Sequence, residues 1–307
     1  AISENSTVDL AKNEYYWDGE VPYDTITIYL TEDSSTKAMA LKSGDVDLAE
    51  NITTASDLEE LKGNPEYYVS TTAGVRLGNS YFNYNGVLAN DALRQAIQYA
   101  IDDETMCSVT VGGMYTAGSS VLPSSLPYGY EQLTDPYAYD LDKATAVLDE
   151  AGIVDMDGDG YRELDGENIN LNYIAYSSRN LDEFAQAVAI TLESIGIGCS
   201  VTVQDYDTAL ANQSAGRFDL ITSNAIVVPT GDPTGFLGNF YSGNSGTYGY
   251  YANDEYDALY EQLLTATDED QRLELIIEMQ QILIDDAATL VHGYYNSTFA
   301  SRADAVS

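Results

Sequence analysis

The sequence predicts an α/β protein, and three observations support this. Segments rich in β-branched and aromatic residues alternate along most of the chain with segments whose apolar residues recur at helical spacing. Several helical segments are followed by a glycine at the position where helices commonly end. With 307 residues and 44% hydrophobic residues, the chain can bury a sizeable core in two domains or in one large one. The alternation favours a sheet with much parallel pairing.

Residues 1–80 are expected to be rich in β structure. Helices are predicted at 34–43, where Gly44 provides the stop, and at 55–61, ended by Gly63-Asn64-Pro65. Alternating apolar and polar residues predict strands at 7–10, 25–30, 46–48, 67–70 and 80–83.

The periodicity changes in the next segment. Leu93, Ile97, Ala100 and Ile101 form one apolar stripe, which predicts a single amphipathic helix over 90–111. A loop rich in Gly, Ser and Pro follows over 112–140. Beyond it we predict helices at 142–151, 181–195, 208–215, 234–240, 255–266 and 268–287. Strands are predicted at 169–176, 199–205, 218–223 and 289–300.

The chain is strongly acidic, with 50 Asp and Glu against 12 Lys and Arg and one His, a formal net charge of −38. Nucleic-acid binding depends on clustered Lys and Arg, and anionic lipid would repel this charge, so neither partner is expected. We interpret the acidity as a solubility device. An anionic ligand would have to be held by backbone N–H groups or by Arg76, Arg94, Arg179 or Arg217, so a neutral or cationic solute fits more easily.

Two cysteines are too few for a disulfide framework. Cys107 lies in a predicted helix and Cys199 starts a predicted strand, which favours two buried thiols but leaves a single bridge open. No apolar run approaches the ~20 residues that span a bilayer. The chain starts inside a predicted strand, without a signal peptide or a lipid-attachment cysteine near Ala1, and we therefore expect a fragment of a longer protein.

An acidic loop is the sharpest short motif. Acidic residues stand at positions 1, 3 and 5 and Gly160 at position 6, as in the first half of an EF-hand loop. Position 12 is Gly166, where a bidentate Glu would be needed. The alternatives are a structural Ca²⁺ site and a polar turn between helix and strand. The candidate Ca²⁺ ligands are Asp155, Asp157, Asp159, Tyr161 and Glu163.

No catalytic constellation is found. The sequence lacks a phosphate-binding Gly loop with Lys, a Gly-x-Ser-x-Gly elbow, and a Cys/His pair at a plausible spacing. His292 is the only imidazole, and on a strand rich in tyrosine it is more often structural than a metal ligand. We expect no enzymatic activity, with a carboxylate-based hydrolase as a rival hypothesis. The 26 tyrosines, against 6 Phe, suit either a binding cleft or the core.

Several segments, read in order, resemble one family of proteins. The chain contains an Asn-x-x-Tyr-Trp segment (13–17), an Ala-Leu-Lys-Ser-Gly-Asp-Val-Asp segment (40–47), Phe82-Asn83, and Leu-Arg-Gln-Ala-Ile-Gln-Tyr-Ala-Ile-Asp (93–102). It continues with segments at 142–152 and 216–220, Asp-Pro-Thr at 232–234, and 267–272. In this order and spacing they resemble the extracellular solute-binding proteins of ABC importers, in the family that takes up oligopeptides, dipeptides and nickel complexes.

The resemblance implies a periplasmic-binding-protein-like fold of two lobes, of type II and the peptide-binding subclass. A ligand would be trapped between the lobes, and a hinge would close on it. Residues 1–83 would form a first-lobe segment, 84–288 the second lobe, and 289–307 a strand returning to the first lobe. Family members extend further at the N-terminus, so the N-terminal part of the first lobe is expected to be missing here. The full-length protein would be extracellular, as a cell-surface lipoprotein, or periplasmic.

One departure concerns the substrate. Peptide-binding members commonly place an Asp before the Asp/Glu-Pro-Thr motif to pair with the peptide's α-amino group, and Pro229 occupies that position here. The ending at 291–297 resembles members that bind nickel, although the His and Arg residues of nickel-chelate binders have no match. Oligopeptides or dipeptides stay slightly ahead of a nickel or other metal chelate.

We therefore predict a receptor that delivers a small peptide or metal chelate to ABC permease subunits in the membrane, acting as a monomer and requiring no cofactor. A Ca²⁺-dependent surface module is the alternative from another class. Backbone groups, tyrosine hydroxyls and aromatic faces would contact the ligand. The predicted ligand-binding residues are Tyr81, Asn83, Tyr84, Val228, Pro229, Thr230, Asp232, His292, Tyr294 and Tyr295.

Overall fold

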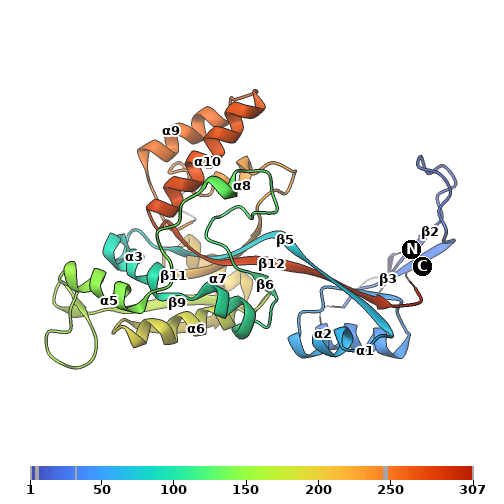
Figure 1. The fold of residues 1–307 in the computed structure, drawn as a ribbon, viewed down its shortest axis with the longest axis horizontal. Helices are drawn as coiled ribbons and strands as arrows, with labels where there is room; N and C mark the ends of the chain where they lie inside the picture. Colours follow the sequence, from blue (N-terminus) through green and yellow to red (C-terminus); the bar gives the residue numbers. More distant parts are fainter. Residues whose placement is uncertain (1, 4–6, 32, 245–247, 306–307) are drawn as a thin grey trace. The chain divides into compact units, whose positions relative to one another are not determined.

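The computed structural model describes residues 2–3, 7–31, 33–244 and 248–305. The chain divides into two compact units, unit 1 (residues 1–71 and 297–307) and unit 2 (residues 72–296). Strands β5 (Tyr67–Phe82) and β12 (Thr289–Arg302) carry the chain from one unit to the other (Figure 1). The division thus falls within these two strands, whereas the sequence placed it at 83/84 and 288/289, at their ends.

Unit 1 contains a small antiparallel sheet and two helices. The sheet has the order β1 (Ile2–Ser3), β2 (Thr7–Ala11), β3 (Thr25–Tyr29). Helices α1 (Ser34–Ser43) and α2 (Ala55–Lys62) lie where they were predicted, and Gly44 ends α1 in the left-handed conformation. Strand β4 (Leu48–Glu50) lies slightly beyond the predicted 46–48, because it pairs with residues 299–301 of β12.

Unit 2 is built on a mixed sheet in the order β10, β9, β11, β5, β12. Strands β9 (Asn170–Tyr176), β10 (Gly198–Gln204) and β11 (Leu220–Ile226) are parallel, as predicted. Strand β5 is antiparallel to β11, and the short β6 (Tyr115–Thr116), which was not predicted, pairs with β12. The parallel group matters for the site because all three strands end at the same edge.

Helices surround this sheet. Helix α6 (Leu181–Ser194) packs on β9 and β10, α3 (Asp91–Ala100) packs on α5 (Leu141–Glu150), and α9 (Asp254–Leu263) packs on α10 (Glu269–Asp285) (Figure 1). The remaining α-helices of the described residues are α4 (Asp103–Thr105), α7 (Tyr206–Ser214) and α8 (Thr234–Leu237). Short helical turns lie at Val87–Ala89, Met106–Thr110 and Tyr130–Gln132, and a β7–β8 hairpin at Glu163–Leu164 and Glu167–Asn168.

One predicted helix and two predicted strands are wrong. The single helix over 90–111 is interrupted, because Ile101 is extended and the Asp102 side chain accepts from the Thr105 backbone N–H, capping a new helix. The strands at 67–70 and 80–83 are one strand, β5. Gly78 weakens the local strand pattern, but the Tyr115 ring lies against it, 2.7 Å from where a Cβ would stand.

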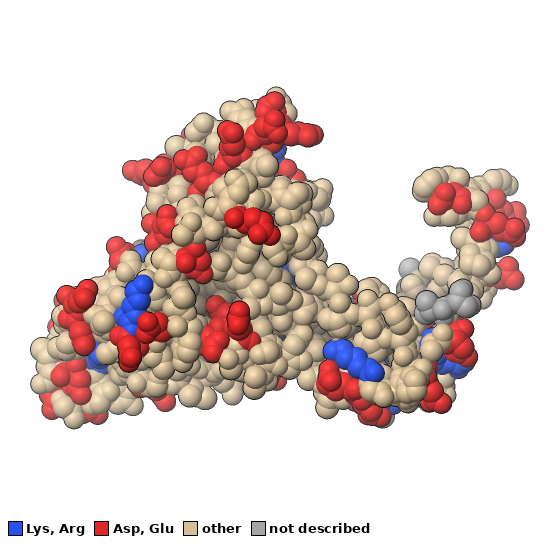
Figure 2. Space-filling view, in the orientation of Figure 1, with Lys and Arg blue, Asp and Glu red and all other residues tan. Residues whose placement is uncertain are grey.

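The core of unit 2 explains part of the tyrosine content. Tyr81, Tyr173, Tyr256 and Tyr294 are among its largest fully buried side chains. The two cysteines are buried free thiols, which confirms the favoured prediction. Carboxylates are scattered over the face seen in Figure 2. Among the described residues, no helix has the length and apolar character to cross a membrane.

Candidate functional site

The candidate site lies in unit 2, where its parallel strands end. Strands β9, β10 and β11 finish at Tyr176, Gln204 and Ile226, and the loops that follow them share one edge of the sheet. Arg76, on the antiparallel β5, pairs in register with Ile226 and so lies at this edge too. In open α/β sheets, ligands bind outside the carboxyl ends of the strands. We refer to this region as the carboxyl edge.

Two arginines, Arg76 and Arg179, lie at the carboxyl edge. The half-buried Arg76 donates from Nη1 to Asn224 Oδ1 at 3.0 Å. The exposed Arg179 has its guanidinium carbon 5.8 Å from the centroid of the Tyr295 ring. Burial and then the positive charge of Arg179 lower the pKa of Arg76. Neither arginine forms an ion pair with any carboxylate among the described residues.

Tyrosines position these arginines. The Tyr115 hydroxyl donates to the Arg179 carbonyl at 2.8 Å and accepts from Asn224 Nδ2 at 3.2 Å. The same ring packs edge-on against Tyr295, with centroids 5.3 Å apart. One tyrosine therefore links the residue that orients Arg76 to the loop that carries Arg179.

A second tyrosine pair borders the arginines. Tyr176 and Tyr206 pack edge-on with ring centroids 5.3 Å apart, and Tyr206 is 59% exposed. Burial, followed by the neighbouring Tyr206, raises the pKa of Tyr176 to about 12, so its hydroxyl stays protonated at neutral pH. The carboxyl edge thus combines two cations, exposed aromatic surface and neutral hydroxyl groups.

The loop after β11 holds four of the predicted ligand-binding residues. Pro229 and Thr230 are exposed and Val228 is half-buried. Asp232 instead pairs with Arg272 at 2.6 Å and accepts from the Thr234 backbone N–H at 2.8 Å. Burial alone would raise the pKa of Asp232, but the hydrogen bonds from Thr234 and Arg272 outweigh it, and the pKa is lowered. The Asp232 carboxylate therefore holds the start of α8 to α10.

Three other predicted residues lie at the opposite end of the sheet. Phe82 pairs with Leu220, six residues along β5 from Arg76, which corresponds to about 20 Å of strand. Here Asn83 Nδ2 donates to the Phe218 carbonyl at 2.7 Å, and the Tyr81 side chain is only 1% exposed. The Tyr84 ring stacks on the Arg94 guanidinium at 4.4 Å.

His292 and Tyr294 are buried in the interior of unit 2. The His292 side chain has no exposed surface, its Nε2 lies 2.8 Å from Ser80 Oγ, and its ring stacks on Phe184. Burial lowers the pKa of His292 to about 3, so the imidazole is neutral. The Tyr294 hydroxyl donates to the Ser120 carbonyl at 2.6 Å. Of the ten predicted residues, Tyr295 and the loop 228–230 are the ones at the carboxyl edge.

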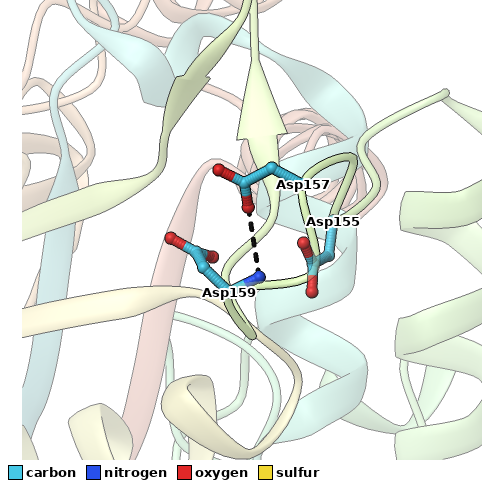
Figure 3. Close-up of side chains that lie close together, drawn as sticks. All are labelled: Asp155, Asp157 and Asp159. Carbon is cyan, nitrogen blue, oxygen red and sulfur yellow. Dashed lines mark hydrogen bonds between the residues drawn. The ribbon is translucent and has the colours of Figure 1, made fainter.

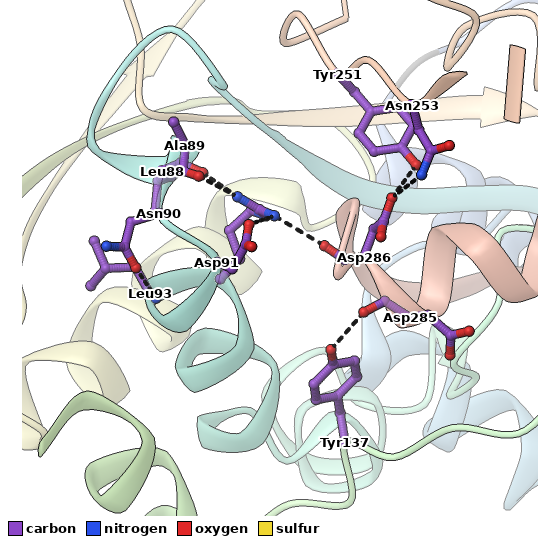
Figure 4. Close-up of polar contacts among 11 residues, drawn as sticks. Leu88, Ala89, Asn90, Asp91, Leu93, Tyr137, Tyr251, Asn253, Asp285 and Asp286 are labelled. Carbon is purple, nitrogen blue, oxygen red and sulfur yellow. Dashed lines mark hydrogen bonds and ion pairs between the residues drawn. The ribbon is translucent and has the colours of Figure 1, made fainter. Parts of the chain in front are cut away.

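The other arginines named as candidate anion ligands are placed differently. Arg94 is 4% exposed and donates to Asp91, to the carbonyls of Leu88 and Ala89, and to that of Asp286. Figure 4 labels these four acceptor residues. Arg217 is exposed, donates to Asn212, and precedes β11 at the end of the sheet away from Arg76. Sequence reasoning had named Arg76 and Arg179 only as two cations among four. Their positions could have distinguished them from the other two: Arg179 follows the end of the parallel strand β9, and Arg76 pairs with the last residue of the parallel strand β11.

The acidic loop forms a compact turn. Single carboxylate oxygens of Asp155, Asp157 and Asp159 lie within 4.8 Å of one another, and all three side chains are exposed (Figure 3). Their oxygens already accept backbone N–H groups of the loop, as Asp155 does from residues 158 and 160 and Asp157 from residue 159. Glu163 is buried and accepts from Met156 N–H, while Tyr161 N–H donates to Asp159. The loop offers oxygen atoms that suit Ca²⁺ and also satisfies its own turn.

Comparison with curated proteins finds relatives of greater length. The nickel-binding periplasmic protein of Escherichia coli is 26% identical over 305 residues, which are 95% of this chain and 57% of the relative. Heme-binding protein A of Haemophilus influenzae is 26% identical over 294 residues, covering 92% and 51%. The dipeptide-binding protein DppE of Bacillus subtilis is 25% identical over 300 residues, covering 95% and 53%. The chain spans about half the length of these relatives.

Solved structures share the fold. NikA from Brucella suis, in complex with Fe(III)-EDTA, superposes with a TM-score of 0.88 at 24% identity, covering 98% of this chain and 62% of that one. A peptide-binding protein AppA from Clostridium difficile, described as putative, superposes with a TM-score of 0.85 at 22% identity, covering 99% and 61%. These likenesses confirm the predicted periplasmic-binding-protein-like fold. The sequence profile of the bacterial extracellular solute-binding proteins, family 5 (middle region), matches residues 1–248, and the chain belongs to this family.

Proposed function

We propose that the chain is part of a solute-binding receptor of an ABC importer, which captures oligopeptides or dipeptides and delivers them to a membrane permease. The observation that carries this proposal is the family match over residues 1–248. Among the relatives, one is named a dipeptide-binding protein and another a nickel-binding protein. The receptor acts as a monomer outside the cytoplasm, anchored as a lipoprotein or free in the periplasm, and catalyses no reaction.

The carboxyl edge supports a ligand of peptide type. Exposed Tyr206, the Tyr295 ring and the loop 228–230 offer aromatic and apolar contact area, while Arg76 and Arg179 offer hydrogen-bond donors. A few polar groups on a largely apolar surface are typical of small-molecule sites. Pro229 leaves the α-amino group of a peptide without a carboxylate at that position, so recognition would rest on other parts of the ligand.

A nickel or other metal chelate is the alternative within the family. His292, the only imidazole, is buried and neutral, with Nε2 beside Ser80 and Tyr173. A metal bound at the carboxyl edge would therefore have to bring its nitrogen ligands with it, as a chelate of histidine does.

Native mass spectrometry of the full-length protein, purified without refolding, tests the proposal. We expect a co-purified mass of a short peptide that is released on denaturation. A mass that carries the isotope pattern of nickel supports the chelate alternative. Turnover of glycoside or peptide substrates by the same preparation would contradict the receptor function.

A further inference from the structure

We propose that a small cavity of unit 2, lined by Asp103, Asp135, Gln98 and Ser119, binds a monovalent inorganic cation, Na⁺ or K⁺. The cavity shares no lining residue with the carboxyl edge, and the inference is independent of the solute that the protein carries. The bound cation joins the segment 98–103, the segment 112–140 and the start of β12, and it stabilises their packing.

The cavity lies between segments that are far apart in the sequence. Gln98 belongs to α3, Asp103 to α4, Ser119 and Asp135 to the segment 112–140, and Thr289 to the start of β12. Its volume is about 30 Å³, which is room for one ion and one water molecule at about 10–15 Å³ each. Asp135 lines the cavity and is exposed, so the cavity opens to solvent beside it and an ion can enter.

The first argument is a buried carboxylate oxygen without a partner. Asp103 Oδ1 is buried and has no hydrogen-bond partner. Burial first, and then the Asp103 charge, raises the pKa of the Cys107 thiol, so the Asp103 carboxyl group lies close to a buried side chain. An ionised carboxylate in the interior is costly unless a donor or a cation pairs with it. A cation bound to Oδ1 removes that cost.

The second argument is that the polar atoms of the cavity suit a cation. No Lys, Arg or His is among the described residues that line it. Gln98 Nε2 donates to the Thr289 carbonyl at 2.9 Å, which leaves Gln98 Oε1 as an acceptor. Asp135 Oδ1 accepts from the Tyr137 backbone N–H at 2.8 Å, which holds this carboxylate in place. With the Ser119 hydroxyl group, the lining offers carboxylate, amide and hydroxyl oxygens, the ligands of hard cations.

A single positive charge matches the cavity. Asp103 contributes the buried carboxylate oxygen of the described lining, whereas Asp135 is exposed and water screens its charge. A monovalent ion therefore balances the buried charge. Ca²⁺ takes about six to eight oxygen ligands, which usually include several carboxylates. The small volume and the single buried carboxylate thus favour Na⁺ or K⁺ over a divalent ion.

Thermal unfolding of the full-length protein at pH 7 tests the proposal. Tm is measured in the chlorides of choline, sodium and potassium at equal ionic strength, because choline is too large for the cavity and controls for general screening. Asp103→Asn keeps the shape of the side chain and removes its charge. Glu104→Gln is the matched control, since Glu104 is the next residue in the chain, acidic and exposed, and does not line the cavity.

We expect Tm to be about 3–6 °C higher in sodium or potassium chloride than in choline chloride, the shift for a site at about tenfold excess of ion over Kd. The larger of the two shifts identifies the preferred ion. Glu104→Gln should keep this difference and Asp103→Asn should lose it. In choline chloride the Tm of Asp103→Asn should be at least that of the unsubstituted protein, which excludes misfolding as the cause. The same Tm in all three salts, or the same salt response in both variants, would overturn the proposal.

Two further measurements do not depend on a variant that folds. Crystals of the unsubstituted protein soaked in thallium(I) acetate, without chloride, should show an anomalous peak in the cavity beside Asp103, because Tl⁺ replaces K⁺. A cavity without that peak at saturating Tl⁺ would contradict the assignment. A rise in Tm caused by millimolar Ca²⁺ in choline chloride, with no rise from Na⁺ or K⁺, would show a divalent site and would also overturn it.

Discussion

Arg94 is expected to be a principal stabilising residue of unit 2, and Arg94→Met tests this. Arg94 is 4% exposed, and its guanidinium donates to three backbone carbonyls, those of Leu88, Ala89 and Asp286, at 2.8, 3.1 and 3.3 Å. It thereby joins the turn before α3 to the end of α10 (Figure 4). Met keeps the length and apolar stem of the side chain but supplies no donor.

The expected loss follows from the groups left without a partner. Each buried carbonyl that loses a donor costs about 1–3 kcal/mol, and removing the buried cation returns part of its desolvation cost. We therefore expect Arg94→Met to lower the free energy of unfolding by about 3 kcal/mol. For a unit of this size, that corresponds to a fall of about 6–12 °C in Tm.

Asp91→Asn is the control, since the Asp91 side chain is 76% exposed. Water screens the exposed Asp91 carboxylate, so its pairing with Arg94 contributes less than about 1 kcal/mol and this substitution should change little. Urea unfolding followed by near-ultraviolet circular dichroism reports on unit 2, because its buried tyrosines dominate that signal and the only tryptophan, Trp17, lies in unit 1. A loss below 0.5 kcal/mol in Arg94→Met, or an equal loss in Asp91→Asn, would refute the reasoning.

Three further predictions concern titration and metal. The pKa of His292 is about 3 when folded and near 6.5 when unfolded, so the unfolded chain binds the extra proton and stability falls as pH drops below about 6.5. Urea unfolding at pH 7 and pH 5 should show about 2 kcal/mol of loss from this residue, absent in His292→Gln. Burial raises the pKa of Asp103, and its Oδ1 has no hydrogen-bond partner. The folded state therefore holds the Asp103 proton more tightly than the unfolded chain does, and the free energy of unfolding falls as pH rises through the pKa of the folded state. Asp103→Asn should raise Tm at pH 7 more than at pH 4, and an equal change at both would contradict this. EDTA should leave Tm unchanged, because the carboxylates of the acidic loop already accept hydrogen bonds from the N–H groups of residues 158–161. A fall in Tm that Ca²⁺ reverses and Mg²⁺ does not would instead show a structural Ca²⁺ site.

Local patterns predicted most elements because the governing interactions are local. Asp33 and Gly44 cap α1 with their own turn, and the apolar stripe of α3 is set by residues within three turns. The predictions failed where interactions with residues far along the chain determine the secondary structure. Strand β5 continues through Gly78 because β11 pairs with it and Tyr115 packs on that glycine.

The candidate site likewise has features that residue type predicts and features that depend on distant parts of the chain. The sequence named Tyr295, the loop 228–230 and the four arginines, since residue type alone suits them to contact a ligand. It also placed Tyr81, Asn83 and His292 in that set. Strand direction puts Tyr81 and Asn83 about 20 Å along β5 from Arg76, and the sheet and α6 enclose His292.

By itself the sequence determined the acidic character, the α/β class, the order of most elements and the family. These depend on composition, periodicity and short motifs. Only the tertiary structure decided which basic side chains form ion pairs, because an ion pair depends on the distance between side chains that can be remote in sequence. Arg272 meets Asp232 across 40 residues of chain, whereas Arg76 and Arg179 form no ion pair with a carboxylate among the described residues.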